Sequence, residues 1–187
     1  MKYFVIGALA LTLAGMASAD NYIGATIGSS SIDIDCGSPA SCDKGDTGFK
    51  LYGGFDLARR ASINGLALEV GYIDFGKATA SFGPARANVD VSAVTFAAAL
   101  RGQFTPALAG VGRLGLGYVE GKASGSVAGF AAGSESASEL KLYGGLGLEY
   151  SLNKQFKLVG SADFTNYETG HNSGSASLIS VGAQYGF

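Results

Sequence analysis

The sequence lacks tryptophan and has little proline, histidine or charge. Its 187 residues include three prolines and one histidine, and only 15% of them are charged, with a net charge of −2. The sequence contains no basic patch of the kind that marks nucleic-acid-binding proteins. Glycine is abundant, but the x-Gly-x-Gly spacings are not followed by a predicted helix, so they are not a nucleotide fingerprint. We therefore expect no nucleic-acid partner and no cofactor.

Long hydrophobic runs are also missing. Outside the N-terminus no apolar run approaches the roughly 18 residues that a membrane-spanning helix needs. Yet 47% of the residues are hydrophobic, and the length suits a single domain. If the protein lies in a membrane, it does not cross it with helices.

The N-terminus is typical of a secretory signal. Lys2 precedes an apolar run from Tyr3 to Met16, and Ala17-Ser18-Ala19 fits a small-residue cleavage site. The prediction is a signal peptide over residues 1–19 and a mature domain over residues 20–187. The alternative is a buried or membrane-anchoring helix, but the run is short for an anchor. Export would place the mature chain in an oxidising compartment.

Two cysteines lie close together in the sequence. Cys36 and Cys42 enclose five residues of a polar loop, which suits a small disulfide in an exported protein. A metal site is the alternative, but it needs more ligands than two thiols, and His171 is far away in the chain. We expect no metal and predict a disulfide.

After Asp20 the chain repeats segments in which apolar and small or polar residues alternate, as in strands with one apolar face. Short turns and longer polar loops connect the segments in turn. The predicted segments are Asn21–Ser30, Thr47–Asp56, Ile63–Phe75, Val89–Phe104, Arg113–Tyr118, Glu139–Tyr150, Phe156–Thr165 and Ser177–Phe187. The predicted long loops are Ser31–Gly45, Lys77–Asn88, Ala123–Ser138 and Glu168–Ala176. Val89 to Ser92 has the opposite parity from the rest of its segment, which indicates a bulge or an end beyond the bilayer.

The contents of the two faces distinguish a membrane barrel from a soluble barrel or sandwich. The polar face carries one or two charges per segment and otherwise Gly, Ala, Ser and Thr, which fit the crowded lumen of a small barrel. Aromatic residues gather near the segment ends, as interfacial girdles do. The predicted fold is all-β: an eight-stranded antiparallel up-and-down transmembrane β-barrel.

Several stretches resemble the OmpA-like eight-stranded outer-membrane barrels of Gram-negative bacteria. They are Asn-Tyr-Ile-Gly-Ala after the signal, Lys50 to Phe55, Leu68 to Gly76, Gly147 to Tyr150, and the terminal Phe187. The resemblance implies an outer-membrane location among lipids and lipopolysaccharide. It also implies the outer-membrane assembly machinery as a partner, which would read Tyr185 and Phe187 as a C-terminal signal. We expect a monomer. The chain has no counterpart of the family's peptidoglycan-binding domain, so no cell-wall tether is expected.

Charged residues on the inward face are expected to pair across the lumen, because isolated charges there are costly. The predicted network comprises Lys50, Glu69, Arg101, Arg113, Lys141 and Glu149, and Lys157 and Asp163 also face inward. The resemblance implies that Glu69, Arg101 and Glu149 belong to a salt-bridge cluster that plugs the lumen or gates a very small pore. The family's basic partner on the seventh strand is replaced by Val159, and Arg113 is the expected substitute.

Three functions fit this sequence. The first is a structural envelope protein with at most a very small or occluded pore. The second is a surface adhesin or opacity-type protein that binds a host or surface ligand through the loops at Ser31–Gly45 and Ala123–Ser138. The third is a lipid A-modifying enzyme, because His171-Asn172-Ser173 resembles the His-x-Ser of outer-membrane deacylases. No Asp or Glu follows Glu168 to orient the histidine, so we expect no enzymatic activity.

Overall fold

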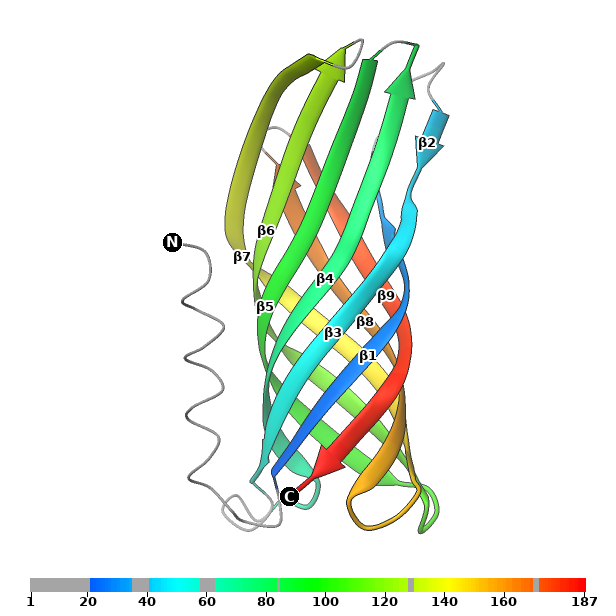
Figure 1. Ribbon diagram of the computed structural model, residues 1–187. Coiled ribbons are helices and arrows are strands. Elements are labelled where there is room, and N and C mark those ends of the chain that lie inside the picture. Colours follow the sequence, from blue (N-terminus) through cyan, green and yellow to red (C-terminus); the bar gives the residue numbers. More distant parts are fainter. Residues whose placement is uncertain (1–20, 35–40, 58–62, 84, 128–129, 170–171) are drawn as a thin grey trace.

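The computed structural model describes residues 21–34, 41–57, 63–83, 85–127, 130–169 and 172–187, which form a closed antiparallel barrel (Figure 1). The strands are β1 (Asn21–Ile32), β2 (Ser41–Asp43), β3 (Gly45–Asp56), β4 (Leu66–Phe82), β5 (Ala85–Gln103), β6 (Leu108–Val127), β7 (Phe130–Ser151), β8 (Phe156–Thr169) and β9 (Asn172–Gly186). The predicted signal peptide lies outside the described residues and stays a prediction.

Among the described residues, no helix is long and apolar enough to span a membrane.

The ring consists of eight long strands. From β3 to β9 each strand pairs with the next one along the chain, and β1 pairs with both β3 and β9, which closes the ring. The last residue completes the closure, because the Phe187 N–H donates to the Asn21 carbonyl at 2.9 Å. The short β2 lies on β4 and is not part of the ring. The predicted eight-stranded antiparallel barrel is therefore confirmed.

The outer face carries the apolar residues. Leu142, Leu146 and Ile179 are 65–69% exposed, whereas Glu69 and Glu149 on the predicted inward face are buried. In water such an exterior would promote aggregation, but in a bilayer it contacts acyl chains. The alternation of faces thus agrees with the prediction in every long strand.

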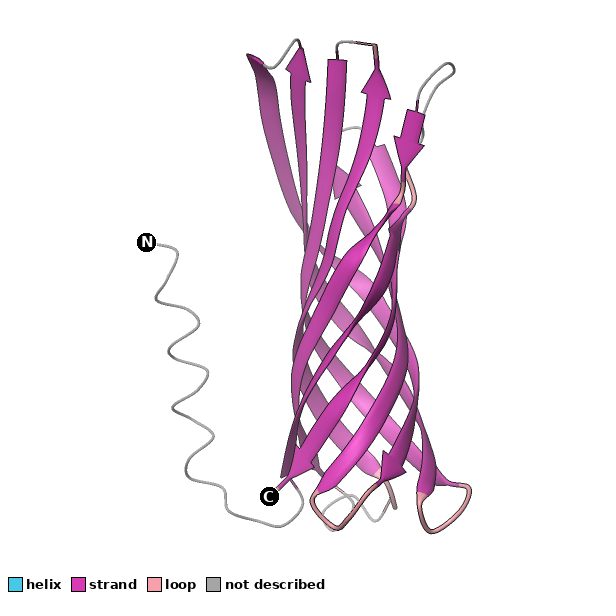
Figure 2. Ribbon diagram, turned by 45° about the vertical axis from the view of Figure 1, so that its right-hand side comes forward, coloured by secondary structure: helices cyan, strands magenta, loops and turns pink. Residues whose placement is uncertain are grey.

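The long loops were predicted too long, because strand pairing continues through most of them. Lys77–Asn88 and Ala123–Ser138 are largely strand, in the hairpins β4–β5 and β6–β7. Glu168–Ala176 is likewise mostly the β8–β9 hairpin, and Ser31–Gly45 contains β2. The small Ser, Gly and Ala residues of these segments tolerate strand geometry once a neighbouring strand pairs with them. Figure 2 shows these hairpins rising above the rest of the barrel to different heights.

The parity change near Val91 does not come from a bulge in β5, because the bulge lies in the partner strand β4. Asp74 pairs with Ser92, and Lys77 with Asp90, so that two residues of β4 oppose Val91. One of these two is Gly76, whose φ of 72° is a conformation that favours glycine. The strand β5 itself keeps one parity, and Val91 points inward with 1% of its surface exposed.

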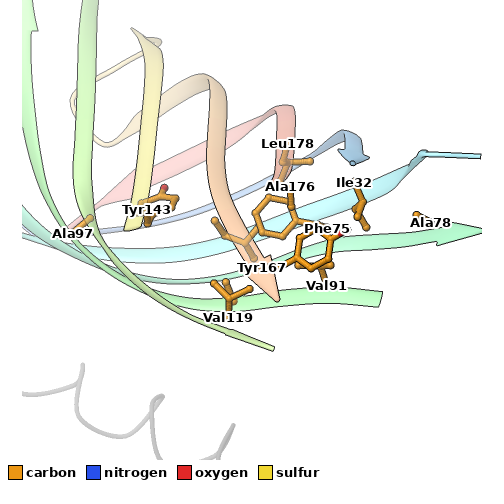
Figure 3. Packing of buried hydrophobic residues seen from close by; sticks show 12 residues of the cluster. Ile32, Phe75, Ala78, Val91, Ala97, Val119, Tyr143, Tyr167, Ala176 and Leu178 are labelled. Carbon is orange, nitrogen blue, oxygen red and sulfur yellow. The ribbon is translucent and has the colours of Figure 1, made fainter. Parts of the chain in front are cut away.

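The inside of the barrel is apolar around Val91, toward the end that carries the long hairpins. Ile32, Phe75, Val91, Tyr167 and Leu178 pack together there, as Figure 3 shows. The outside carries exposed ion pairs, including Lys77–Asp90 at 3.4 Å and Lys122–Glu120 at 3.0 Å. An apolar inside and a charged outside suit water rather than lipid, so this end of the barrel projects beyond the bilayer. By the rule that long connections are extracellular, it is the outer end.

Candidate functional site: the charged lumen

Glu69 is the centre of the first lumen network. It lies on β4, points inward and is 4% exposed. Its carboxylate accepts hydrogen bonds from the Tyr22 hydroxyl at 2.7 Å, from Arg113 Nε at 2.5 Å and from Arg101 Nη2 at 3.2 Å. Residues from β1, β4, β5 and β6 therefore meet at one buried carboxylate.

Arg101 extends this network to Glu149 on β7. Its Nε donates to Glu149 Oε1 at 2.9 Å, and Lys157 on β8 donates to Glu149 Oε2 at 2.8 Å. The structure thus brings Glu69, Arg101, Arg113 and Glu149 together. Val159 lies buried in the wall, and the cation on its strand comes from Lys157, two residues away.

Lys50 belongs to a second network. Its ammonium contacts Asp163 Oδ1 at 2.6 Å and Tyr143 Oη at 2.8 Å, and both Lys50 and Asp163 are almost fully buried. Ser161 donates to the other oxygen of Asp163 at 2.9 Å. Ser180 lies 3.0 Å from Ser161 and donates to Thr26 at 2.8 Å, which continues the hydrogen bonds across β1, β8 and β9.

Three inward tyrosines, Tyr22, Tyr52 and Tyr143, complete the filling of the lumen, and no role was predicted for them. Tyr22 and Tyr52 each lie over a glycine of the neighbouring strand: a Cβ at Gly54 would be 2.0 Å from the Tyr22 ring, and one at Gly24 would be 2.3 Å from the Tyr52 ring. Tyr143 hydrogen-bonds to Asp163. In the sequence, these residues could have been recognised as inward tyrosines followed two positions later by an inward glycine, as in Tyr22-Ile-Gly24.

Lys141 does not join the lumen networks, which corrects the prediction. It lies higher on β7, near the outer end, where it contacts Glu139 at 2.8 Å and Glu168 of β8 at 2.5 Å. Hydrogen bonding to Lys141 holds the pKa of Glu168 below its ordinary value, so this carboxylate stays ionised. The inward parity of Lys141 was predicted correctly, but the barrel wall opens at this height.

The remaining predicted residues lie at the two ends of the barrel. Cys42 is in β2, but Cys36 lies outside the described residues, so the disulfide between them stays a prediction. Tyr185 packs against Phe156 and Phe187 at the short-turn end, with ring centroids 4.9 Å and 6.3 Å apart. The role of this aromatic cluster in assembly stays a prediction.

A cavity of about 540 Å³ lies at the short-turn end of the lumen, where Arg101, Lys157 and Asp56 line it. Beyond Arg101 and Lys157 come the buried ion pairs of the first network. His171 lies outside the described residues, so the His-x-Ser stretch cannot be assembled into a site. Within the described parts of the chain, no three His, Cys, Asp or Glu side chains are placed to hold a metal.

The family follows from the sequence as a whole. Residues 4–187 match the model of the outer membrane protein beta-barrel domain. The chain belongs to this family. The protein is accordingly located in the outer membrane of a Gram-negative envelope.

Solved structures of outer-membrane barrels share its fold. Ail, the attachment invasion locus protein of Yersinia pestis, is 20% identical, with a TM-score of 0.57 over 90% of this chain and 99% of Ail. Neisserial surface protein A is 16% identical, with a TM-score of 0.60 over 89% of this chain and 97% of that protein. OprG of Pseudomonas aeruginosa is 14% identical, with a TM-score of 0.53 over 90% and 96% of the two chains. No curated protein sequence matches this outer-membrane barrel.

Proposed function

We propose that the protein is a structural component of the outer membrane whose lumen is occluded. The observation that carries this proposal is the buried network around Glu69, which joins side chains of six strands across the barrel. Ion pairs with little access to water are hard to separate one at a time, because each lost partner leaves a buried charge. The network therefore favours a rigid plug over a conducting pore.

The apolar cluster at the outer end supports the same function. Phe75, Val91, Tyr167 and Leu178 fill the barrel above the second network. A solute entering from outside would have to displace this packing and then the Lys50–Asp163 pair. The protein would thus add a stable, closed barrel to the membrane rather than a path through it.

Conductance in planar lipid bilayers tests the occlusion. We expect no steady unitary conductance from the wild-type protein or from Glu69→Gln, since the remaining charges and tyrosines still fill the lumen. A stable wild-type conductance that Glu69→Gln changes would instead indicate a gated pore. A deletion strain tests the envelope role: it should become sensitive to detergents, and Glu69→Gln should restore resistance wherever it assembles to wild-type levels.

A surface-binding role is the second candidate, and the height of the β6–β7 hairpin favours it. Ail, a barrel of the same fold, has been crystallised with the heparin analogue sucrose octasulfate, which illustrates ligand binding by such a barrel. The matched test replaces residues 121–137 with Asn-Gly, which keeps Glu120 opposite Ser138 in a tight turn. A binding protein should then lose adhesion to host cells or matrix, whereas a purely structural protein should keep its envelope phenotype.

A further inference from the structure

The barrel wall is not continuous at its outer end. The pairing of β7 with β8 runs only from Tyr143 to Ser151. Above Tyr143, β7 continues to Phe130 and pairs with β6 alone, whereas β8 ends at Thr169 and pairs with β9 alone. We call residues 133–142 the β7 edge. In both Figure 1 and Figure 2 the β6–β7 hairpin rises beyond the β8–β9 hairpin.

The backbone of the β7 edge presents unpaired groups on the side of β8. The Thr165 hydroxyl donates to the Leu142 carbonyl at 3.1 Å, which shows that this carbonyl faces β8. Strand alternation then places the N–H and C=O groups of Leu140, Ser138 and Ser136 on the same side. Among the described residues no backbone pairing from β8 reaches them. Such an edge is a template for another strand.

The charge around the β7 edge is negative. Glu135, Glu139 and one cation, Lys141, lie along the edge and Glu168 lies beside it on β8, which gives a local net charge of 1 − 3 = −2. Lys141 already contacts Glu139 and Glu168. On the adjacent β6, Glu120 and Lys122 offset each other at 3.0 Å. Glu135 is exposed and has no ion pair within the part of the chain that the structure describes.

We propose that the β7 edge binds an extended, cationic peptide segment of a partner protein, which adds to the sheet as a strand beside β7. The added strand would exchange backbone hydrogen bonds with Leu140, Ser138 and Ser136 and place Lys or Arg side chains near Glu135 and Glu139. Backbone pairing supplies affinity in this mode of recognition, and side-chain complementarity supplies selectivity. The inference rests on the surface-binding role and adds the site and the chemistry of the partner.

A second copy of this chain is a poorer occupant of the edge. Pairing of two β7 edges would bring together two surfaces of the same negative charge, with Glu135 of one copy opposite Glu139 of the other when the pairing is centred on Ala137. Like charges on adjacent strands are destabilising. A cationic segment meets no such repulsion and gains from the same carboxylates.

Labelled peptides test the proposal with the full-length barrel in lipid nanodiscs. The probe is a nine-residue peptide that alternates Lys and Thr, and its binding is measured by fluorescence anisotropy. We expect salt-sensitive binding, at least tenfold weaker for a peptide with N-methyl groups at alternate residues, and none for the Glu–Thr peptide. Absence of binding by the Lys–Thr peptide, or equal binding by its N-methylated form, would overturn strand addition.

Single substitutions locate the binding on the β7 edge. Ser136→Pro removes an N–H that faces the free side and leaves the ladder with β6 intact. It should weaken peptide binding at least fivefold, whereas Ser136→Ala should not change it. The unheated gel mobility checks that each variant remains folded. Unchanged binding by a folded Ser136→Pro barrel would overturn the inference.

Further results separate the inference from the broader role. The surface-binding role stands without the inference if the Asn-Gly replacement of 121–137 abolishes cell adhesion while Ser136→Pro leaves peptide binding intact. Both fail if that replacement leaves cell adhesion unchanged and the Lys–Thr peptide does not bind. A wild-type dimer that Ser136→Pro converts to a monomer would assign the edge to self-pairing and overturn the peptide proposal.

Discussion

Lys50 donates a hydrogen bond across the lumen to the Tyr143 hydroxyl, at 2.8 Å. The two residues come from the two copies of Lys-Leu-Tyr-Gly-Gly, at Lys50–Gly54 and Lys141–Gly145. The copies are alike in sequence but different in environment: Lys50 is 1% exposed and pairs with Asp163, whereas Lys141 lies near the outer end. Their lysines should therefore differ greatly in their contribution to stability.

Lys50→Met should strongly destabilise the barrel. It leaves the buried Asp163 carboxylate without its cation, and removing one partner of a buried ion pair costs about 3–5 kcal/mol. Urea unfolding in lipid vesicles, followed by circular dichroism, measures the loss. Lys141→Met is the matched control, and it should shift the unfolding midpoint much less. Equal shifts in the two variants would contradict the assignment of Lys50 to the plug.

Gly54→Val should also destabilise the barrel, by about 1–3 kcal/mol, since overpacking a filled interior forces its neighbours to move. The new Cβ would be 2.0 Å from the Tyr22 ring, which must then leave its hydrogen bond with Glu69. Gly53→Val is the control, because a Cβ there comes no nearer than 3.7 Å to another residue. The same unfolding assay compares the two variants, and a larger effect at Gly53 would argue against this packing.

The faces of the strands could be predicted from the sequence, but their lengths could not. Alternation at Leu140–Tyr150 is strict because one side meets lipid and the other meets a polar lumen. Above the bilayer the outside becomes polar and the inside apolar, so the pattern near Val91 inverts although the strand continues. Ala123–Ser138 has few apolar residues on either face, and its strand geometry depends on the pairing of β6 with β7, which composition does not reveal.

The members of the lumen networks could be predicted only in part. Inward parity identified Glu69, Arg101, Arg113 and Glu149, because a charge in an apolar strand must turn away from lipid. Height along the barrel depends on strand stagger, which local sequence does not specify. For that reason Lys50 was not separated from the Glu69 network, and Lys141 was placed in the lumen.

Leu146→Arg should destabilise the barrel by about 2–4 kcal/mol, the cost of a cation on the lipid face near the bilayer midplane. Leu146 is 66% exposed and lies between Leu140 and Tyr150 on the outward row of β7. Ser134→Arg, on the same outward row but beyond the bilayer, should have little effect. Unfolding in vesicles compares the two, and a similar cost at both positions would show that the outer hairpin lies in lipid.

Deletion of Phe187 should reduce assembly in cells more than it reduces stability. Its backbone closes the ring with Asn21, and its ring stacks on Tyr185, with centroids 6.3 Å apart. Burial of one such side chain is worth about 2 kcal/mol, a loss that a barrel closed by so many other hydrogen bonds should survive. The truncated protein should therefore still fold into lipid vesicles in vitro, while its level in the outer membrane falls severalfold. Phe104→Ala, at the same end of the barrel, should leave that level unchanged. Normal outer-membrane levels of the truncated protein would show that Phe187 is not part of an assembly signal.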